Sequence, residues 1–317
     1  MHKFIKQFVL LNSLLLLLFP LSVTAHQKIN VVASFSIIAD LVKNVGGDYI
    51  SITTLVGPNA SIHSYEPTPH DAKTLKNAHI IFINGLHLEG FINRLTTATG
   101  TKALLVEVSA NISPFEINEI KYQKNNSTHR IHHHGSIDPH AWQTIPNVEI
   151  YIKNIAIAFC KIDQQSCENY NKNARIYIQK LKAMHATITK KMSTLPKDKR
   201  TIITSHDAFG YFAHEYNLTI LAPESASKEA TAADVAKLIK QIKNNKVSAL
   251  FVENISNPRL IEQISKETGL KIGGILYSDA LSGKEGPAAT YLDMMEYNVN
   301  TIINAITKLK THNITGM

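Results

Sequence analysis

Three histidines and one aspartate stand in short segments that look like loops after apolar strands. His63, His140 and His206 would each offer an imidazole nitrogen, and Asp279 a carboxylate. Three neutral imidazoles and one carboxylate make a complete tetrahedral ligand set of the type that binds zinc. The four residues are far apart in sequence, so only the folded chain can bring them together. The segments that contain them are Ser61–Pro69, Asp138–Trp142, Thr204–Phe209 and Leu276–Leu281.

Residue type alone does not select these four, because the chain has 15 histidines and most loop histidines are simply solvated. Their context does select them. The runs Asp-Pro-His-Ala-Trp from Asp138 and Ser-His-Asp-Ala-Phe-Gly from Ser205 resemble the zinc- and manganese-binding solute-binding proteins of bacterial ABC importers. The similarity covers essentially the whole mature chain. It implies a monomeric binding protein, not an enzyme, whose partners are a metal ion and a membrane permease.

The resemblance also implies which residues bind the metal: the positions matching His63, His140, His206 and Asp279 are the ligands in that family. In manganese-selective members the position matching His206 is typically a glutamate. A histidine there favours Zn²⁺, because Mn²⁺ prefers more oxygen ligands. However, the stretch Leu281–Asn298 also resembles the manganese branch. We therefore expect Zn²⁺ as the cargo, with Mn²⁺ or Fe²⁺ as the alternative.

Acidic residues close to these positions are candidates to orient the imidazole rings. They are Glu66, Asp138 and Asp207, and each is equally well explained as a helix cap or a solvated loop acid. A remote alternative function is a zinc hydrolase in which Asp279 acts as the base. The absence of a Gly-rich phosphate loop or a Gly-x-Ser-x-Gly elbow makes an enzyme the weaker interpretation. An extracellular adhesin is neither supported nor excluded.

The first 25 residues predict a secretory signal peptide. Lys3 and Lys6 precede an apolar run from Phe8 to Leu21, and a small residue, Ala25, marks the expected cleavage site. The run is short for a membrane span, and no cysteine follows it for lipid attachment. We expect a periplasmic protein, with a retained N-terminal anchor as the alternative.

The composition bears on partners and on redox state. The chain has 33 basic and 25 acidic residues, and its lysines are scattered without interleaved aromatic residues, so no nucleic-acid binding is expected. Its only cysteines are Cys160 and Cys167. Because exported proteins meet an oxidising compartment, we expect a disulfide between them, with two reduced thiols as the alternative.

Short apolar runs alternate with helical patterns along the chain. This pattern predicts an α/β fold of two βα lobes, each with a mostly parallel four-stranded sheet, joined by one long rigid helix. We place the N-terminal metal-binding lobe at 26–165, the linking helix at 166–196 and the C-terminal metal-binding lobe at 197–317. The expected strands are Ile29–Ala33, Ile50–Val56, His79–Ile83, Ala103–Val106, Thr201–Thr204, Leu218–Leu221, Ala249–Val252 and Lys271–Ile275.

In open α/β sheets, ligands bind beyond the carboxyl ends of the strands. His63 and His140 would then come from the first lobe, and His206 and Asp279 from the second. A metal ion between them would hold the two lobes together.

The segment Ser109–Ile137 predicts an exposed irregular loop, because it is polar and lacks periodicity. It contains a histidine cluster that could form a weak accessory metal site, since His-rich tracts bind zinc. A solvated loop without a binding role is the alternative. The clustered histidines are His129, His132, His133 and His134.

Overall fold

The computed structural model describes residues 27–117, 136–223, 232–244 and 246–308. The expected signal peptide and the cluster His129, His132, His133 and His134 lie outside these residues, so both remain predictions.

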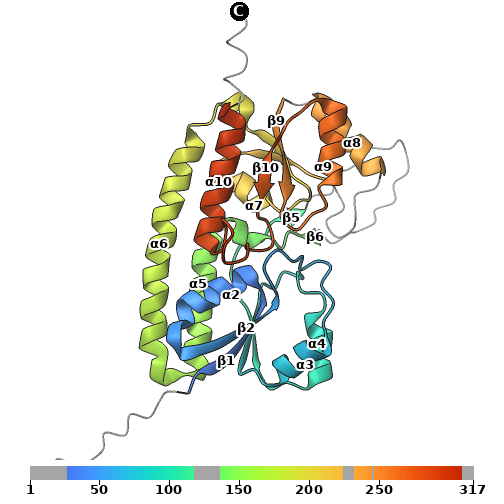
Figure 1. Ribbon diagram of the computed structural model, residues 1–317. Helices are drawn as coiled ribbons and strands as arrows, with labels where there is room; N and C mark the ends of the chain where they lie inside the picture. Colours follow the sequence, from blue (N-terminus) through green and yellow to red (C-terminus); the bar gives the residue numbers. More distant parts are fainter. Residues whose placement is uncertain (1–26, 118–135, 224–231, 245, 309–317) are drawn as a thin grey trace, which may run out of the picture.

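Two four-stranded sheets form the framework of the protein (Figure 1). The first has the order β2-β1-β3-β4 and the second β10-β9-β7-β8, and every neighbouring pair is parallel. Numbered within its own lobe, each sheet has the order 2-1-3-4. The predicted α/β fold with two βα lobes is confirmed. The strands are β1 (Ile29–Phe35), β2 (Ile50–Val56), β3 (Ile80–Ile83), β4 (Leu104–Glu107), β7 (Thr201–Ile203), β8 (Thr219–Leu221), β9 (Val247–Glu253) and β10 (Ile272–Leu276).

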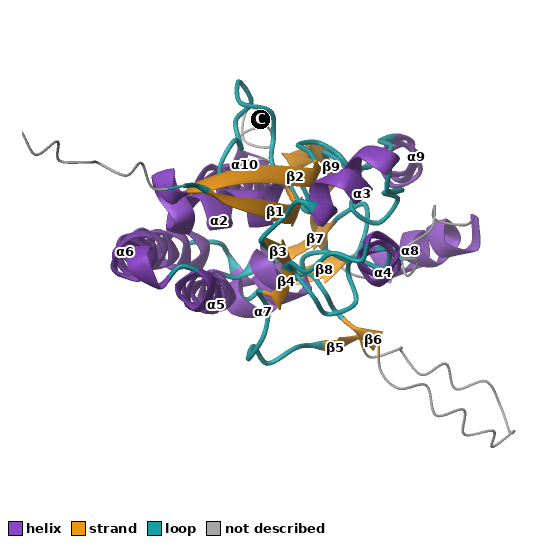
Figure 2. Cartoon of the chain, turned by 90° about the horizontal axis from the view of Figure 1, so that it is seen from below, coloured by secondary structure: helices purple, strands orange, loops and turns teal. Residues whose placement is uncertain are grey.

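Helices cover both faces of the first sheet, which explains why its central strands are almost wholly apolar. Figure 2 shows α2, α5 and α6 on one side of these strands and α3 and α4 on the other. All four residues of β3 are buried. The helices are α2 (Ser36–Gly46), α3 (Pro69–Lys76), α4 (Ile92–Thr99), α5 (Ile145–Ile162), α6 (Cys167–Ser193), α7 (Gly210–Tyr216), α8 (Ala232–Asn244), α9 (Arg259–Thr268) and α10 (Tyr291–Lys308).

Helix α6 is the long connection between the two lobes. Its 27 residues contain no glycine or proline and span about 40 Å. It packs against α5 along its first half and against α10 along its second half (Figure 1). The predicted disulfide between Cys160 and Cys167 is present and joins the end of α5 to the start of α6. Within the described residues, no helix is both long and apolar enough to cross a membrane.

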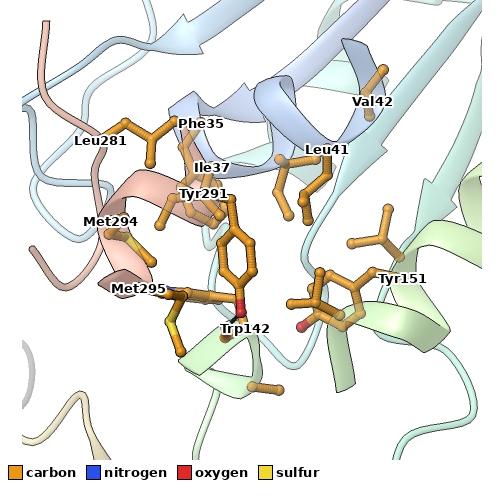
Figure 3. Close-up of a cluster of buried hydrophobic side chains, with 14 of the residues drawn as sticks. Phe35, Ile37, Leu41, Val42, Trp142, Tyr151, Leu281, Tyr291, Met294 and Met295 are labelled. Carbon is orange, nitrogen blue, oxygen red and sulfur yellow. Dashed lines mark hydrogen bonds between the residues drawn. The ribbon is translucent and has the colours of Figure 1, made fainter. Parts of the chain in front are cut away.

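One continuous core runs from the first lobe into the second. Figure 3 shows Phe35, Leu41 and Trp142 of the first lobe in one cluster with Tyr291 and Met295 from the start of α10. The rings of Phe35 and Trp142 meet edge to face, with centroids 5.1 Å apart. A separate small core lies under α8 and α9. Because the lobes share packed side chains, large relative motion would expose apolar surface.

The interpretation of Ser109–Ile137 as irregular throughout is wrong at two short stretches of the segment. Glu116–Ile117 (β5) and Ser136–Ile137 (β6) pair as a short antiparallel ladder. Strands of two residues are too short to produce a visible alternation of apolar and polar residues. The pairing brings the chain back to Asp138, directly before His140.

Candidate metal centre

Each of the four predicted residues follows a structural element that ends at the junction of the lobes. His63 lies in the loop after β2, His206 after β7 and Asp279 after β10, while His140 comes between β6 and a single 3₁₀ turn at Ala141–Gln143. Three of the four therefore lie beyond the carboxyl ends of parallel strands, where ligand sites of open α/β sheets are found.

The structure brings these four side chains together. The Nε2 atom of His63 lies 3.3 Å from Nε2 of His140 and 3.1 Å from Oδ2 of Asp279. The Nε2 atom of His206 lies 3.2 Å from the same oxygen, and Nε2 of His140 lies 3.8 Å from Oδ1. All four ligand atoms are within 4.8 Å of one another. Zinc bonds of about 2.0–2.1 Å at tetrahedral angles separate ligand atoms by about 3.3 Å, so the spacing fits a zinc-sized ion.

Burial makes the carboxylate of Asp279 dependent on a cation. Its side chain is 0% exposed, against 2% for His140, 12% for His206 and 20% for His63. Neither of its oxygens accepts a well-oriented hydrogen bond from the described residues. A buried, ionised carboxylate without donors is costly unless a positive charge lies beside it. Of the four side chains, His63 is the most exposed to solvent.

Asp138 orients the ring of His140. One carboxylate oxygen, Oδ1, lies 2.8 Å from Nδ1 of His140 and also accepts the backbone N–H of His140 at 2.9 Å. With Nδ1 donating its proton to Asp138, the lone pair of Nε2 points at the cluster, as a metal ligand requires. The predicted orienting role of Asp138 is therefore supported by geometry.

Glu253, at the end of β9, contacts His206 through both carboxylate oxygens and is absent from the sequence-based candidates. Its Oε2 atom lies 2.6 Å from Nδ1 of His206, and its Oε1 atom accepts the backbone N–H of His206 at 2.9 Å. The only sequence signal is an acid directly after six strand residues, Val247–Val252. That signal becomes informative once β9 is known to lie beside β7, the strand that precedes His206.

The other two acidic candidates do not contact the four residues through any described hydrogen bond or ion pair. Glu66 is exposed. Asp207 is partly buried, and its burial raises the pKa of its carboxyl group above the ordinary value, with the nearby carboxylate of Asp138 adding to the effect. His63 likewise has no carboxylate partner for its Nδ1 atom within the described part of the chain.

Opposing effects set the charges of His206 and Asp279. Burial lowers the pKa of His206, but the carboxylates of Glu253 and Asp279 outweigh it and hold that pKa well above 6.5. Burial raises the pKa of Asp279, but the imidazoles of His206 and His140 outweigh it and hold that pKa well below 3.8. Without a metal ion, a proton on His206 therefore balances the buried carboxylates.

The loop that holds Asp279 is attached to the first lobe, although it follows a strand of the second. The carbonyl of Ser278 accepts hydrogen bonds from Nε1 of Trp142 at 2.9 Å and from the side-chain amide of Gln143 at 2.8 Å. The backbone N–H of Leu281 donates to Oγ of Ser36 at 3.0 Å. The expected division of the site into two ligands per lobe is thus true of the chain order but not of the contacts, which link Asp279 to both lobes.

Comparison with known protein families shows which family the chain belongs to. Residues 31–305 match the family model described as ZnuA, zinc-uptake complex component A, periplasmic. The chain belongs to this family. Its members are metal-binding components of uptake systems, so the protein is a binding component and not an enzyme.

The relatives differ in the metal that they are named for. The chain is 35% identical to the iron-binding protein YfeA of Yersinia pestis, over 87% of this chain and 86% of the relative. It is 30% identical to the manganese-binding lipoprotein MntA of Halalkalibacterium halodurans, over 89% of this chain and 90% of that protein.

Solved structures agree with the fold. The cadmium-bound periplasmic metal-binding protein of Candidatus Liberibacter asiaticus superposes with a TM-score of 0.78 at 29% identity, covering 88% of this chain and 100% of the other. The periplasmic zinc-binding protein TroA of Treponema pallidum gives a TM-score of 0.78 at 29% identity, covering 88% and 99%. The names of the relatives leave the choice among iron, manganese and zinc open.

Proposed function

We propose that this protein captures Zn²⁺ in the periplasm and delivers it, as a monomer, to the permease of an ABC importer. His63, His140, His206 and Asp279 are the proposed ligands. The observation that carries this proposal is the buried carboxylate of Asp279, which meets three imidazole Nε2 atoms at the separations of a tetrahedral site.

The chemistry of the donor atoms favours zinc and favours transport over catalysis. Three nitrogen atoms and one oxygen atom suit a borderline cation, whereas Mn²⁺ is better served by more oxygen. Four protein ligands also fill a tetrahedral shell, so no position stays open for the water molecule that a zinc hydrolase must activate. Asp138 and Glu253 fix two of the rings in advance, which adds to metal affinity.

The position of the cluster suggests how the permease recognises the loaded protein. His63 and His140 belong to the first lobe and His206 to the second, with the Asp279 loop bonded to both. Binding at this junction ties together surfaces on both lobes. Because the lobes share one core, the proposed change is a local tightening around the ligand loops, without wide hinge closure.

Metal content of the native protein tests the cargo. Protein purified from the periplasm without chelator or added metal should carry about one zinc ion per chain. A His140→Ala variant prepared in the same way should carry less than about a tenth of that amount, because the site loses a preoriented ligand. Manganese or iron in excess over zinc in the wild-type protein would overturn the assignment of zinc.

Manganese is the second candidate, favoured by relatives such as MntA and by the family resemblance of Leu281–Asn298. Replacing His206 with glutamate gives two imidazoles and two carboxylates, and it also places a new carboxylate beside Glu253. Both metals should bind more weakly. The ratio of zinc to manganese affinity should fall at least about tenfold, because the carboxylate that replaces the imidazole is a hard ligand, which manganese prefers.

Competition titrations of both metals against one chelator measure that ratio. A matched control is His185→Glu, because His185 contacts Tyr216 and Glu215 outside the cluster and its replacement should leave the ratio unchanged. An unchanged ratio in His206→Glu would mean that residue 206 does not select the metal.

A further inference from the structure

Asn84 is a fully buried side chain that connects the first sheet to the His140 segment. It follows β3, and its side-chain nitrogen donates to the carbonyl of Pro139 at 2.9 Å. Its side-chain oxygen accepts the hydroxyl of Tyr151, on α5, at 2.6 Å. Its own carbonyl accepts the hydroxyl of Ser109, after β4, at 2.6 Å. The hydrogen bonds of Asn84 thus fix its amide in one orientation, since the donor and the acceptor of the side chain have different partners.

A second buried side chain, Glu89, accepts the backbone N–H groups of both Asn84 and Gly85. One oxygen of Glu89 accepts the backbone N–H of Asn84 and the hydroxyl of Ser34, both at 2.7 Å. The other accepts the backbone N–H of Gly85 at 3.2 Å. Glu89 is 5% exposed, and none of these partners belongs to the metal cluster. The proposed transport chemistry gives this buried carboxylate no role.

The turn between Asn84 and Glu89 is strained. Gly85, Leu86 and His87 all have positive φ, at 84°, 55° and 64°. Left-handed conformations at two residues that carry a Cβ atom are unfavourable and persist only where surrounding contacts impose them. The hydrogen bonds of Glu89 to Asn84 and Gly85 are such contacts. Strain of this kind often marks a functional position, and the group that this turn positions is the side chain of Asn84.

Asn84 acts on the peptide group that joins Pro139 to His140. The carbonyl before that one, of Asp138, accepts the hydroxyl of Tyr211 from α7 at 2.9 Å. Two successive carbonyls are therefore held from opposite lobes, one by Asn84 and one by Tyr211. The side chain of Asp138 then fixes the ring of His140. Few rotations remain free between the sheet and the Nε2 atom of His140.

We propose that Asn84, itself held by Glu89, is a positioning residue that sets the place of His140 in the metal site. This proposal rests on the proposed function, because it assigns Asn84 a part in metal affinity. Asn84 does not touch the ion. It places the Asp138–His140 turn so that Nε2 meets the other three ligand atoms, and its removal leaves the carbonyl of Pro139 without that donor.

Replacing Asn84 with alanine should weaken zinc binding about tenfold, the lower end of the effect seen when groups that orient ligands are removed. It should also change the visible d–d spectrum of the cobalt-substituted protein, because a displaced imidazole alters the ligand field. Tyr151→Phe, which removes only the hydroxyl that holds the amide oxygen, should give a smaller change of the same kind. Glu89→Gln keeps the shape of the side chain and should lie between wild type and Asn84→Ala.

Asn154→Ala is the matched control. Asn154 is also an asparagine of the first lobe whose side chain donates to two backbone carbonyls, those of Val108 and Ala110, both at 2.8 Å. Those bonds do not reach the His140 segment. The control should lower thermal stability but leave zinc affinity and the cobalt spectrum unchanged.

A readout without metal separates this proposal from the proposed function. Nitrogen-15 spectra of the metal-free protein report the proton on Nδ1 of His140, assigned by its loss in His140→Ala. Asn84→Ala should shift that signal and Asn154→Ala should not. Failure of the wild-type protein to bind zinc or cobalt would overturn the proposed function. Wild-type binding with equal affinity, spectrum and His140 signal in Asn84→Ala would overturn the positioning role alone. If Asn84→Ala and Asn154→Ala lose zinc affinity equally, Asn84 contributes only to general stability. That result would also overturn the positioning role.

Discussion

Replacing Asp279 with asparagine should weaken zinc binding by about a thousandfold. Asp279 is the only carboxylate among the four clustered residues, and it is fully buried. Asparagine keeps its shape but removes the charge, which leaves a divalent ion among neutral ligands in a largely buried site. Removing one partner of a buried charge pair costs about 3–5 kcal/mol, and about 4 kcal/mol corresponds to a thousandfold change in affinity.

Chelator competition at pH 7.5 measures this loss, and thermal unfolding of the metal-free protein serves as the check on folding. Asp40→Asn is a matched control, since Asp40 is a partly buried aspartate, on α2, that accepts the backbone N–H of Tyr291 at 3.0 Å outside the cluster. It should keep wild-type zinc affinity. A loss of less than tenfold in Asp279→Asn would show that Asp279 is not a ligand.

The fold could be predicted almost entirely from local pattern. Strand β3 is an apolar run bounded by turn residues, and helix α3 begins with Thr68 and Pro69, a cap followed by proline. The structure adds the reciprocal half of that cap, in which the carboxylate of Asp71 accepts the backbone N–H of Thr68. The β5–β6 pair is not predicted, because strands of two residues are too short to show an alternation of apolar and polar residues.

The sequence predicts the four clustered residues of the site but not the residues that support them. His63, His140, His206 and Asp279 stand in segments that resemble a known family, and the structure brings them together. Glu253 and Asn84 are single polar residues after apolar strands, where the same residue types are commonly solvated. Their meaning depends on which strands are neighbours, and strand order is set by long-range packing that local sequence does not encode.

The attachment of the Asp279 loop to the first lobe was missed for the same reason. It depends on Trp142 and Gln143, which donate to one carbonyl more than a hundred residues away. Backbone carbonyls have no residue-specific signature, so such bonds can be found only in three dimensions.

Zinc binding should release about one proton at pH 7, which comes from His206. Because the pKa of His206 in the metal-free protein lies well above 6.5, its imidazole is protonated at neutral pH and must lose that proton to bind an ion. Apparent zinc affinity should therefore fall about tenfold for each unit of pH below that pKa. The decline should begin at a higher pH than 6.5, the ordinary value for histidine.

The effect on the stability of the metal-free protein has the opposite sign. Protonation of His206, whose pKa is raised on folding, contributes stability that is complete below about pH 6.5 and is lost as pH rises through the folded pKa. Ionisation of Asp279, whose pKa is lowered, contributes stability above about pH 3.8 that is lost as pH falls through the folded pKa. Between these limits the proton on His206 supplies the positive charge that the metal ion supplies in the bound protein. Raising the pH therefore lowers the folding stability of the metal-free protein and raises its apparent zinc affinity.

Titration calorimetry in buffers of different ionisation enthalpy counts the released proton directly. The Glu253→Gln variant supplies the internal comparison, because the carboxylate of Glu253 is the largest influence that raises the pKa of His206. Its loss should lower that pKa, reduce proton release at pH 7.5 and move the onset of the affinity decline to lower pH. Binding heats in the wild-type protein that do not depend on the buffer at pH 7 would contradict the protonated His206. Equal proton release in both proteins would instead show that Glu253 does not control it.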